Sequence, residues 1–260
     1  MRLAALPAIE AADQLIVVPQ ADALQPSGAT VISITVDSNI NPLFGSNEIL
    51  KTQSWSNSDD AAALQLVRLR QGGKIWQKSY RFQPSGVYHQ RKKPADKKQL
   101  ELPQEQWSTF EKKFYRYDSK NHQCPAVLEN SELLYLVSVI DFTEQKVPLS
   151  LCVFDKQQLY RVKITAEGSR QLKVNYLERS QDQQIRRKRV IDVIKITCQP
   201  HSLTAPDEAS DEFSFLGLKG DFDIFVDPAS RIPVQVSGKI PTIGKIDITL
   251  QEVILSPVKS

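Results

Sequence analysis

The feature that most constrains the fold of this chain is a repeated alternation of apolar and polar residues over short segments. In "LYRVKI", Tyr160, Val162 and Ile164 alternate with two basic residues, which is the period of a β-strand with one buried face. The segment "RQGGKIW" joins two strand-like stretches through residues 72–73, a Gly–Gly pair that accepts the positive φ of a tight hairpin turn. Short links favour antiparallel pairing, because parallel strands need long crossovers.

This rhythm covers most of the chain. Seven strand-like segments follow Lys146 and four or five precede residue 93, so the predicted total is about eleven or twelve strands. The sequence therefore predicts an all-β fold of antiparallel strands with one or two short helices. Residues 1–28, with three prolines and little periodicity, are predicted to be an extended lead-in, and residues 29–258 a single antiparallel β domain.

Helical spacing is confined to an insert near residues 104–141. In "LPQEQWSTFEKKFYRY", Trp107, Phe110 and Phe114 lie at i, i+3 and i+7, which is typical of an amphipathic helix. In "ENSELLYLVSVIDF" the apolar residues again recur at helical spacing. Both segments are expected to cover an open face of the sheet.

Composition indicates a folded globular protein. The 260 residues are 41% hydrophobic and 24% charged, with a net charge of +3, which predicts neither a nucleic-acid binder nor a lipid-surface protein. No stretch reaches the roughly 20 apolar residues that a membrane-spanning helix needs. The N-terminal "MRLAALPAIEAADQLIVVP" is a poor secretory signal because Pro7 and Glu10 interrupt it. We therefore expect either a cytoplasmic protein or one whose signal is removed or lies upstream.

The cysteines and histidines give one candidate metal site. Of the three cysteines, Cys124, Cys152 and Cys198, at most two can pair, and a bond between Cys152 and Cys198 is one possibility. The pairs "HQC" and "CQPH" could supply a tetrahedral Cys2His2 zinc site. A chance arrangement of rare residues is the alternative that we favour. The four zinc candidates are His122, Cys124, Cys198 and His201.

Charged segments offer weaker candidates. "DFDIFVD" places Asp221, Asp223 and Asp227 on one side of a strand, either as paired acid and base or simply as its solvent face. The basic run "RKKPADKK" over residues 91–98 is either a phosphate or lipid-headgroup patch or a solvated loop. The basic run 186–189 is expected at a strand start or hairpin tip. The segment "QPHSLTAPDEASDE" lacks the ligand spacing and glycine of a calcium loop and is predicted to be an acidic loop.

The second half of the chain also resembles a known family. "CVFDKQQLYRVKI", "KRVIDVIKITC" and "FDIFVDPASRIPVQVSGKIPTIGKIDITL" are similar, in this order, to a bacterial domain of unknown function whose members look like exported envelope proteins. Asp227, the triplet 232–234 and Gly244 occupy its pattern of a strand ending in Asp, a "Leu/Ile-Pro-Val" strand start and a Gly-initiated final strand. The resemblance spans roughly residues 29–255. Phe225 stands near the family's usual aromatic position, and this chain lacks the family's clear signal peptide.

The resemblance implies a large curved antiparallel sheet or incomplete barrel, similar in shape to the half-barrels of lipoprotein carriers, with one or two short helices covering the concave side. It also implies a periplasmic or cell-envelope location. It brings no catalytic residue and no cofactor. The chain itself contains no Gly-x-Ser-x-Gly elbow, phosphate-binding glycine loop or His-Glu-x-x-His motif.

We therefore expect a non-enzymatic envelope protein that binds a lipid, a lipoprotein or a partner protein in a concave sheet. The candidate lining residues are Trp55, Trp76, Trp107, Phe110 and Phe114. One alternative is a structural or assembly protein that binds through an exposed sheet edge or through the 186–189 hairpin. Another is an enzyme or metalloprotein built on the Cys2His2 set.

Overall fold

The computed structural model describes residues 2–18, 22–40, 48–117, 124–144, 147–180, 183–203 and 212–254. The contacts divide the chain into two compact units, Met1–Glu129 and Asn130–Ser260, where the sequence suggested one domain over residues 29–258. The predicted architecture is confirmed at the level of class, because both units are built mainly on antiparallel strands with a few short helices. Neither sheet closes into a barrel within the described ranges.

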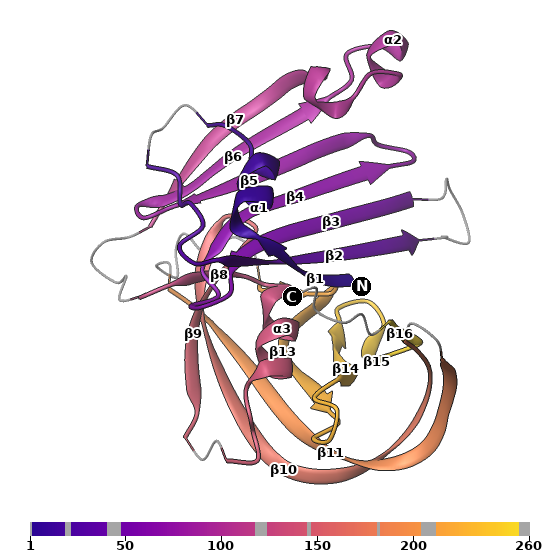
Figure 1. Ribbon diagram of the computed structural model, residues 1–260. Coiled ribbons are helices and arrows are strands. Elements are labelled where there is room, and N and C mark those ends of the chain that lie inside the picture. The colour runs from indigo at the N-terminus through magenta and orange to yellow at the C-terminus, as the bar shows by residue number, and fades with distance from the viewer. Residues whose placement is uncertain are drawn as a thin grey trace. The chain divides into compact units, whose positions relative to one another are not determined.

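The first unit is an antiparallel meander whose strands pair in chain order, as Figure 1 shows. Short turns connect several of its strands, and Gly72, with φ of 123°, provides the positive φ expected between the fourth and fifth strands. The seven strands are β1 (Arg2–Pro7), β2 (Thr30–Ile40), β3 (Glu48–Asn57), β4 (Ala63–Gln71), β5 (Trp76–Gln83), β6 (Gly86–Lys93) and β7 (Ser108–Arg116).

The N-terminal segment is part of this unit, which corrects the prediction of an extended lead-in. β1 pairs along β2, and α1 (Ala8–Gln14) buries Ala11 against Trp55. The indole Nε1 of Trp55 donates to Gln14 Oε1 at 3.2 Å. The buried amide of Gln65 accepts from the backbone N of Ile16 at 2.7 Å and donates to the backbone O of Gln14 at 3.1 Å. These bonds tie the segment after α1 to β3 and β4.

The helix predicted around Trp107, Phe110 and Phe114 is wrong. Residues 108–116 form the strand β7, which pairs with β6. The β6–β7 connection holds only α2 (Lys97–Leu100) and the 3₁₀ turn η1 (Gln104–Gln106). A register shift opposite Arg91 and Lys92 adds one residue to β7. Phe110 and Phe114 therefore lie on an irregular strand, and Trp107 directly precedes it at the end of η1.

The second unit is a strongly curved sheet in the order β15-β14-β13-β11-β10-β9. Its long β10–β11 hairpin curls in Figure 1, and β16 pairs in parallel with the far end of β10. The short strand β8 (Val127–Glu129) ends the first unit. The strands of the second unit are β9 (Leu149–Asp155), β10 (Gln158–Arg179), β11 (Gln184–Ser202), β12 (Ser214–Phe215), β13 (Leu218–Val226), β14 (Pro233–Ile240), β15 (Gly244–Thr249) and β16 (Glu252–Ile254).

A predicted helix does form in this unit. α3 (Glu132–Val139) buries Leu133, Leu134 and Val137 and contacts β14. The alternation of β13 leaves Phe222, Ile224 and Val226 on one face, all of them buried. The opposite face of the sheet also buries apolar residues, since Phe225 and Val193 there are 1% and 0% exposed and belong to a second core cluster.

Candidate cationic–aromatic site

The structure separates the five predicted lining residues. Trp55 lies in the core beside α1, and Trp107 is also buried, with its indole Nε1 donating to the backbone O of Leu102 at 3.1 Å. Phe114 pairs with Tyr88 across β6 and β7, on the same side of the sheet as Trp55 by strand alternation. Trp76 and Phe110 lie together on the opposite face.

Trp76 and Phe110 form a cluster with three cations from neighbouring strands. The Arg91 guanidinium carbon is 5.9 Å from the centroid of the Trp76 ring and 5.4 Å from that of Phe110. Lys78 Nζ lies 5.1 Å from the Trp76 centroid, and Lys93 Nζ lies 4.0 Å from the Phe110 centroid. All four distances are within cation–π range. We call Trp76, Lys78, Arg91, Lys93 and Phe110 the cationic–aromatic cluster.

The strand register explains this arrangement. Lys78 on β5 is directly opposite Arg91 on β6, so the two cations share one face of the sheet. Arg91 and Lys93 share that face because they are two residues apart. The register shift in β7 places the ring of Phe110 in contact with both Arg91 and Lys93. Like charges placed opposite each other destabilise a sheet, so this pairing is costly without a compensating anion.

Positive charge in the cluster is only weakly compensated. Burial lowers the pKa of Lys78, and Arg91 and Arg68 lower it further by repulsion, while Glu111, which is opposite Arg91 on β7, raises it. The carboxylates on this side are engaged with other cations, Glu111 with Lys113 at 2.5 Å and Glu129 with Arg68 at 3.2 Å. Among the described residues no carboxylate forms an ion pair with Arg91, and the buried Arg91 Nε has no hydrogen-bond partner.

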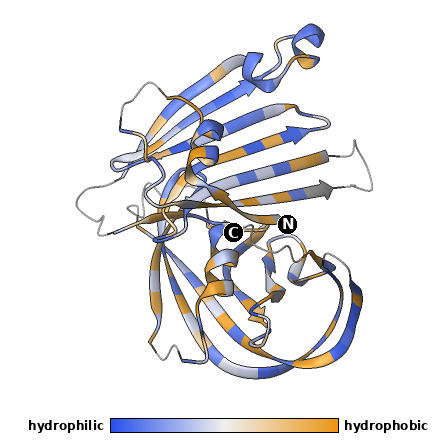
Figure 2. Cartoon of the chain, viewed as in Figure 1, coloured by the Kyte–Doolittle hydropathy of each residue, from blue (hydrophilic) through white to orange (hydrophobic). Residues whose placement is uncertain are grey.

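Exposed apolar side chains accompany the cations. Phe110 is 57% exposed, and Leu100 and Leu102 in the β6–β7 connection are 45% and 41% exposed. Lys97 and Lys98 lie in the same connection, on α2. Figure 2 shows this end of the sheet as mostly hydrophilic with separate hydrophobic residues. The predicted basic run at residues 91–98 thus has two parts. Arg91 and Lys93 at the end of β6 belong to the cluster, and Lys97 and Lys98 lie on α2 in the β6–β7 connection.

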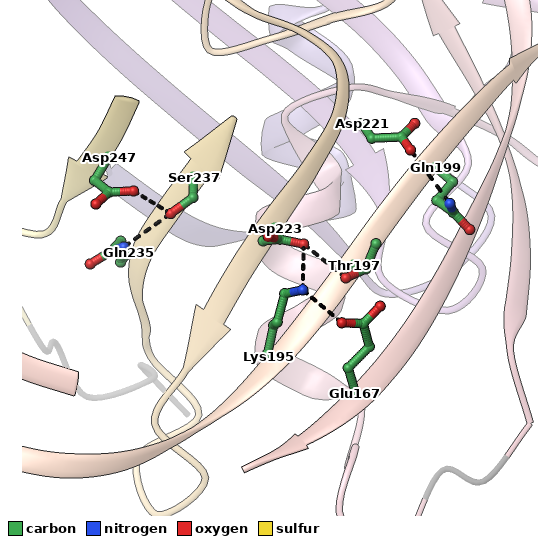
Figure 3. A network of polar contacts seen from close by, with 9 residues as sticks. All are labelled: Glu167, Lys195, Thr197, Gln199, Asp221, Asp223, Gln235, Ser237 and Asp247. Carbon is green, nitrogen blue, oxygen red and sulfur yellow. Dashed lines mark hydrogen bonds and ion pairs between the residues drawn. The ribbon is translucent and has the colours of Figure 1, made fainter. Parts of the chain in front are cut away.

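The second unit carries a polar network across its sheet (Figure 3). Lys195 Nζ lies 2.6 Å from Glu167 Oε2 and 3.4 Å from Asp223 Oδ1, and Thr197 Oγ1 donates to Asp223 at 2.8 Å. The hydrogen bond to Glu167 raises the pKa of Lys195. The network links β10, β11 and β13 through cross-strand contacts.

The three aspartates of "DFDIFVD" do not form an acid–base pair. Asp223 belongs to the network above, and Asp221 accepts a 3.4 Å bond from Gln199. Asp227 shapes the turn before β14, since its carboxylate accepts from the backbone N of Ala229 at 3.0 Å and from Ser230 Oγ at 2.8 Å. Its Asp-Pro start suits a turn, because the carboxylate bonds backbone and side-chain groups two or three residues on.

The Cys2His2 set is not assembled as a zinc site in the part of the chain that the structure describes. Cys124 is disulfide-bonded to Cys152, so its sulfur is not a free thiolate. Cys198 is buried, and burial raises the pKa of its thiol. His201 lies three residues further along β11, on the opposite face of the strand. His122 is outside the described residues. No group of three or more potential ligands occurs among those that are described.

The basic run 186–189 is partly neutralised within its own hairpin. Arg187 forms a bidentate pair with Glu178, both contacts at 2.9 Å, and Arg186 Nε donates to Asn175 Oδ1 at 2.7 Å. Most of the acidic loop 199–212 lies outside the described residues. The described helices include none long and apolar enough to span a bilayer.

Sequence reasoning identified Trp76 and Phe110 as lining candidates and placed Arg91 and Lys93 in a candidate basic patch, but it did not identify Lys78 or bring these two sets together. Lys78 and Arg91 are far apart in the sequence and meet only through the β5–β6 register. The sequence did contain a signal for this meeting of cations and aromatics. The alternating segments "WQK" and "HQRKK" are joined by a short turn, so their cations can share one face of a hairpin. Comparisons with protein-family models, curated proteins and solved structures found no significant match to this chain.

Proposed function

We propose that this protein is a non-enzymatic binding protein that docks on an anionic lipid surface through the cationic–aromatic cluster. The observation that carries the proposal is that three cations, Lys78, Arg91 and Lys93, lie against two aromatic rings. None of the three forms an ion pair with a carboxylate among the described residues. Lipid phosphates would supply the missing negative charge. An envelope location, implied by the family resemblance, is part of this proposal.

A lipid surface fits the cluster better than a nucleic acid does. Both rings already have cations of this chain over them, which leaves them less free to stack on bases. Exposed Phe110, Leu100 and Leu102 beside lysines are the combination of apolar and basic side chains that binds at a membrane interface. The net charge of +3 is small for a protein that follows a polyanion.

A sheet-edge partner is less favoured. β7 is the last strand of the first sheet and is largely exposed along its length. However, Glu111, Lys112 and Lys113 lie in succession on it, and charged side chains on an edge strand oppose pairing with another chain. Assembly through this edge would appear as stable oligomers in solution.

Removal of two cluster cations tests the lipid proposal. Arg91→Gln with Lys93→Gln is expected to weaken binding to vesicles of phosphatidylglycerol and phosphatidylcholine by roughly 30-fold, because each basic residue contributes about 1 kcal/mol near an anionic membrane. Binding is measured by co-sedimentation. Vesicles of phosphatidylcholine alone should bind the unaltered protein weakly.

The matched control is Lys188→Gln with Arg189→Gln, which removes the same charge from the exposed β11 strand of the second unit. This control should bind anionic vesicles as the unaltered protein does. Equal weakening of both double variants would show that only net charge matters and would refute the site. Displacement from vesicles by millimolar inorganic phosphate would identify a soluble anion as ligand and overturn the membrane proposal.

A further inference from the structure

A cavity of about 180 Å³ lies in the second unit, apart from the cluster described above. It is bordered by residues 172–176 of β10, by residues 234–235 of β14 and by the link 249–251 between β15 and β16. Two backbone hydrogen bonds of 2.9 Å fix that link, one from Leu250 N to the O of Val234 and one from Leu177 N to the O of Gln251. The cavity is therefore framed by ordered backbone on more than one side.

Its walls combine polar side chains with a buried apolar part. Val174 and Tyr176 from β10 and Val234 from β14 are 5%, 3% and 3% exposed. They belong to one core cluster, against which Leu172 and Leu250 pack. An apolar body bound here would remain in contact with this core instead of with water, which is favourable in proportion to the area removed from solvent.

One polar group in the cavity has its orientation fixed by the network of Figure 3. Ser237 Oγ lies 2.5 Å from Asp247 Oδ1, and a carboxylate can only accept, so the single hydroxyl hydrogen of Ser237 is donated there. Ser237 must then accept from Gln235, and the Gln235 Nε2 group is 3.0 Å away. This leaves Gln235 Oε1 pointing away from Ser237, with no hydrogen-bond partner among the described residues.

A second polar group comes from Tyr176. The residue is 3% exposed and lines the cavity, and its hydroxyl forms no hydrogen bond with any residue that the structure describes. Burial raises the pKa of Tyr176, and the nearby carboxylates of Glu178 and Asp227 raise it further. The hydroxyl therefore stays protonated at neutral pH and can donate as well as accept.

We propose that this cavity binds a small neutral molecule with a compact apolar body and one hydroxyl group. The ligand hydroxyl would donate to Gln235 Oε1 and accept from the Tyr176 hydroxyl, while the body packs on Val174, Val234 and Leu250. A water molecule takes about 30 Å³ of liquid, so the cavity holds roughly six waters or a ring of similar size. The assigned class is thus a hydroxylated ring of about seven non-hydrogen atoms, alone or as the end of a larger molecule.

Phenol and toluene form a matched pair of probes, because they have the same shape and differ in a hydroxyl against a methyl. The intact protein is titrated with each and binding is followed by ligand-observed NMR. Phenol is expected to bind with a dissociation constant on the order of 1 mM and about tenfold more tightly than toluene, because toluene leaves Gln235 Oε1 unpaired. Equal affinities, or no phenol binding at ten times that concentration, would overturn the proposal.

Two variants locate the site. Gln235→Met removes the acceptor at nearly constant volume and should abolish the preference for phenol, whereas Gln199→Met on β11, two strands away from β14 in the sheet, should leave it unchanged. Val174→Phe fills the cavity and should abolish binding of both probes. Circular dichroism verifies that each variant is folded. Should Val174→Phe fold and still bind phenol as tightly as the unaltered protein, the ligand is bound elsewhere and the assignment is wrong.

Discussion

The pKa of His89, which lies next to the cluster, depends on the burial of its ring and on the charges around it. It is 3% exposed, neither ring nitrogen has a hydrogen-bond partner in the part of the chain that the structure describes, and the ring centroids of Tyr80 and Tyr115 lie 4.7 and 5.8 Å away. Burial lowers its pKa to about 4, with Lys78 and other cations contributing and Glu111 opposing. The imidazole is therefore neutral in the folded protein at neutral pH, and it adds no charge to the cationic face.

This shift gives the first unit a defined pH dependence. Because the pKa of His89 is lower in the folded state than the unfolded value of 6.5, the unfolded state takes up the proton first, and stability falls as pH decreases from 6.5 towards 4. Between pH 7 and 5 this residue should remove about 2 kcal/mol from the free energy of unfolding.

Urea unfolding followed by tryptophan fluorescence measures this effect, because all three tryptophans lie in the first unit. The variant His89→Phe keeps an aromatic ring between the two tyrosines but cannot titrate there. Its stability should change less over the same pH range. Parallel pH profiles for the variant and the unaltered protein would show that His89 is not responsible.

At the scale of elements, the β6–β7 pairing depends on Gly86. A Cβ at this position would lie 2.3 Å from the backbone O of Tyr115 and 2.7 Å from the ring of Phe114. Those distances are too short for the strands to keep their spacing, and backbone cannot rotate away as a side chain can. The strand that carries Phe110 is thus positioned through a residue without a side chain.

Gly86→Ala should therefore reduce the free energy of unfolding by about 2–3 kcal/mol through overpacking, measured by the same urea titration. Ser85→Ala, at the exposed neighbouring position, is the control and should unfold close to the unaltered protein. Similar urea midpoints for Gly86→Ala and Ser85→Ala would contradict this account of the β6–β7 contact.

The elements also show what can be read from the sequence. Alternation and the Gly72 turn were enough for the antiparallel meander, since both are local signals. β7 was misassigned because its two phenylalanines, together with Trp107 just before the strand, coincide with a helical spacing. The cationic–aromatic cluster could not be predicted, because it needs the register of three strands and a one-residue shift between two of them. The N-terminal segment was missed for a related reason, since β1 and α1 are stabilised by distant strands.

For the whole molecule, overall charge is a poor guide to binding. A net charge of +3 over 260 residues predicts little attraction to an anionic surface. The attraction proposed here is local, because Lys78, Arg91 and Lys93 gather on one face of the first sheet while other cations are paired with carboxylates. Such a contact should also weaken with added salt, since exposed charges are screened over about 8–10 Å at physiological ionic strength.

The most direct test is whether the cluster itself touches the lipid. Trp55→Phe with Trp107→Phe leaves Trp76, the ring of the cluster, as the sole tryptophan. Anionic vesicles that contain brominated phospholipid should quench its fluorescence strongly once the protein is bound. A protein that retains only the buried Trp55 should be quenched far less. Binding to the vesicles without quenching of Trp76, or with equal quenching of Trp55, would show that another surface makes the contact and would contradict the account.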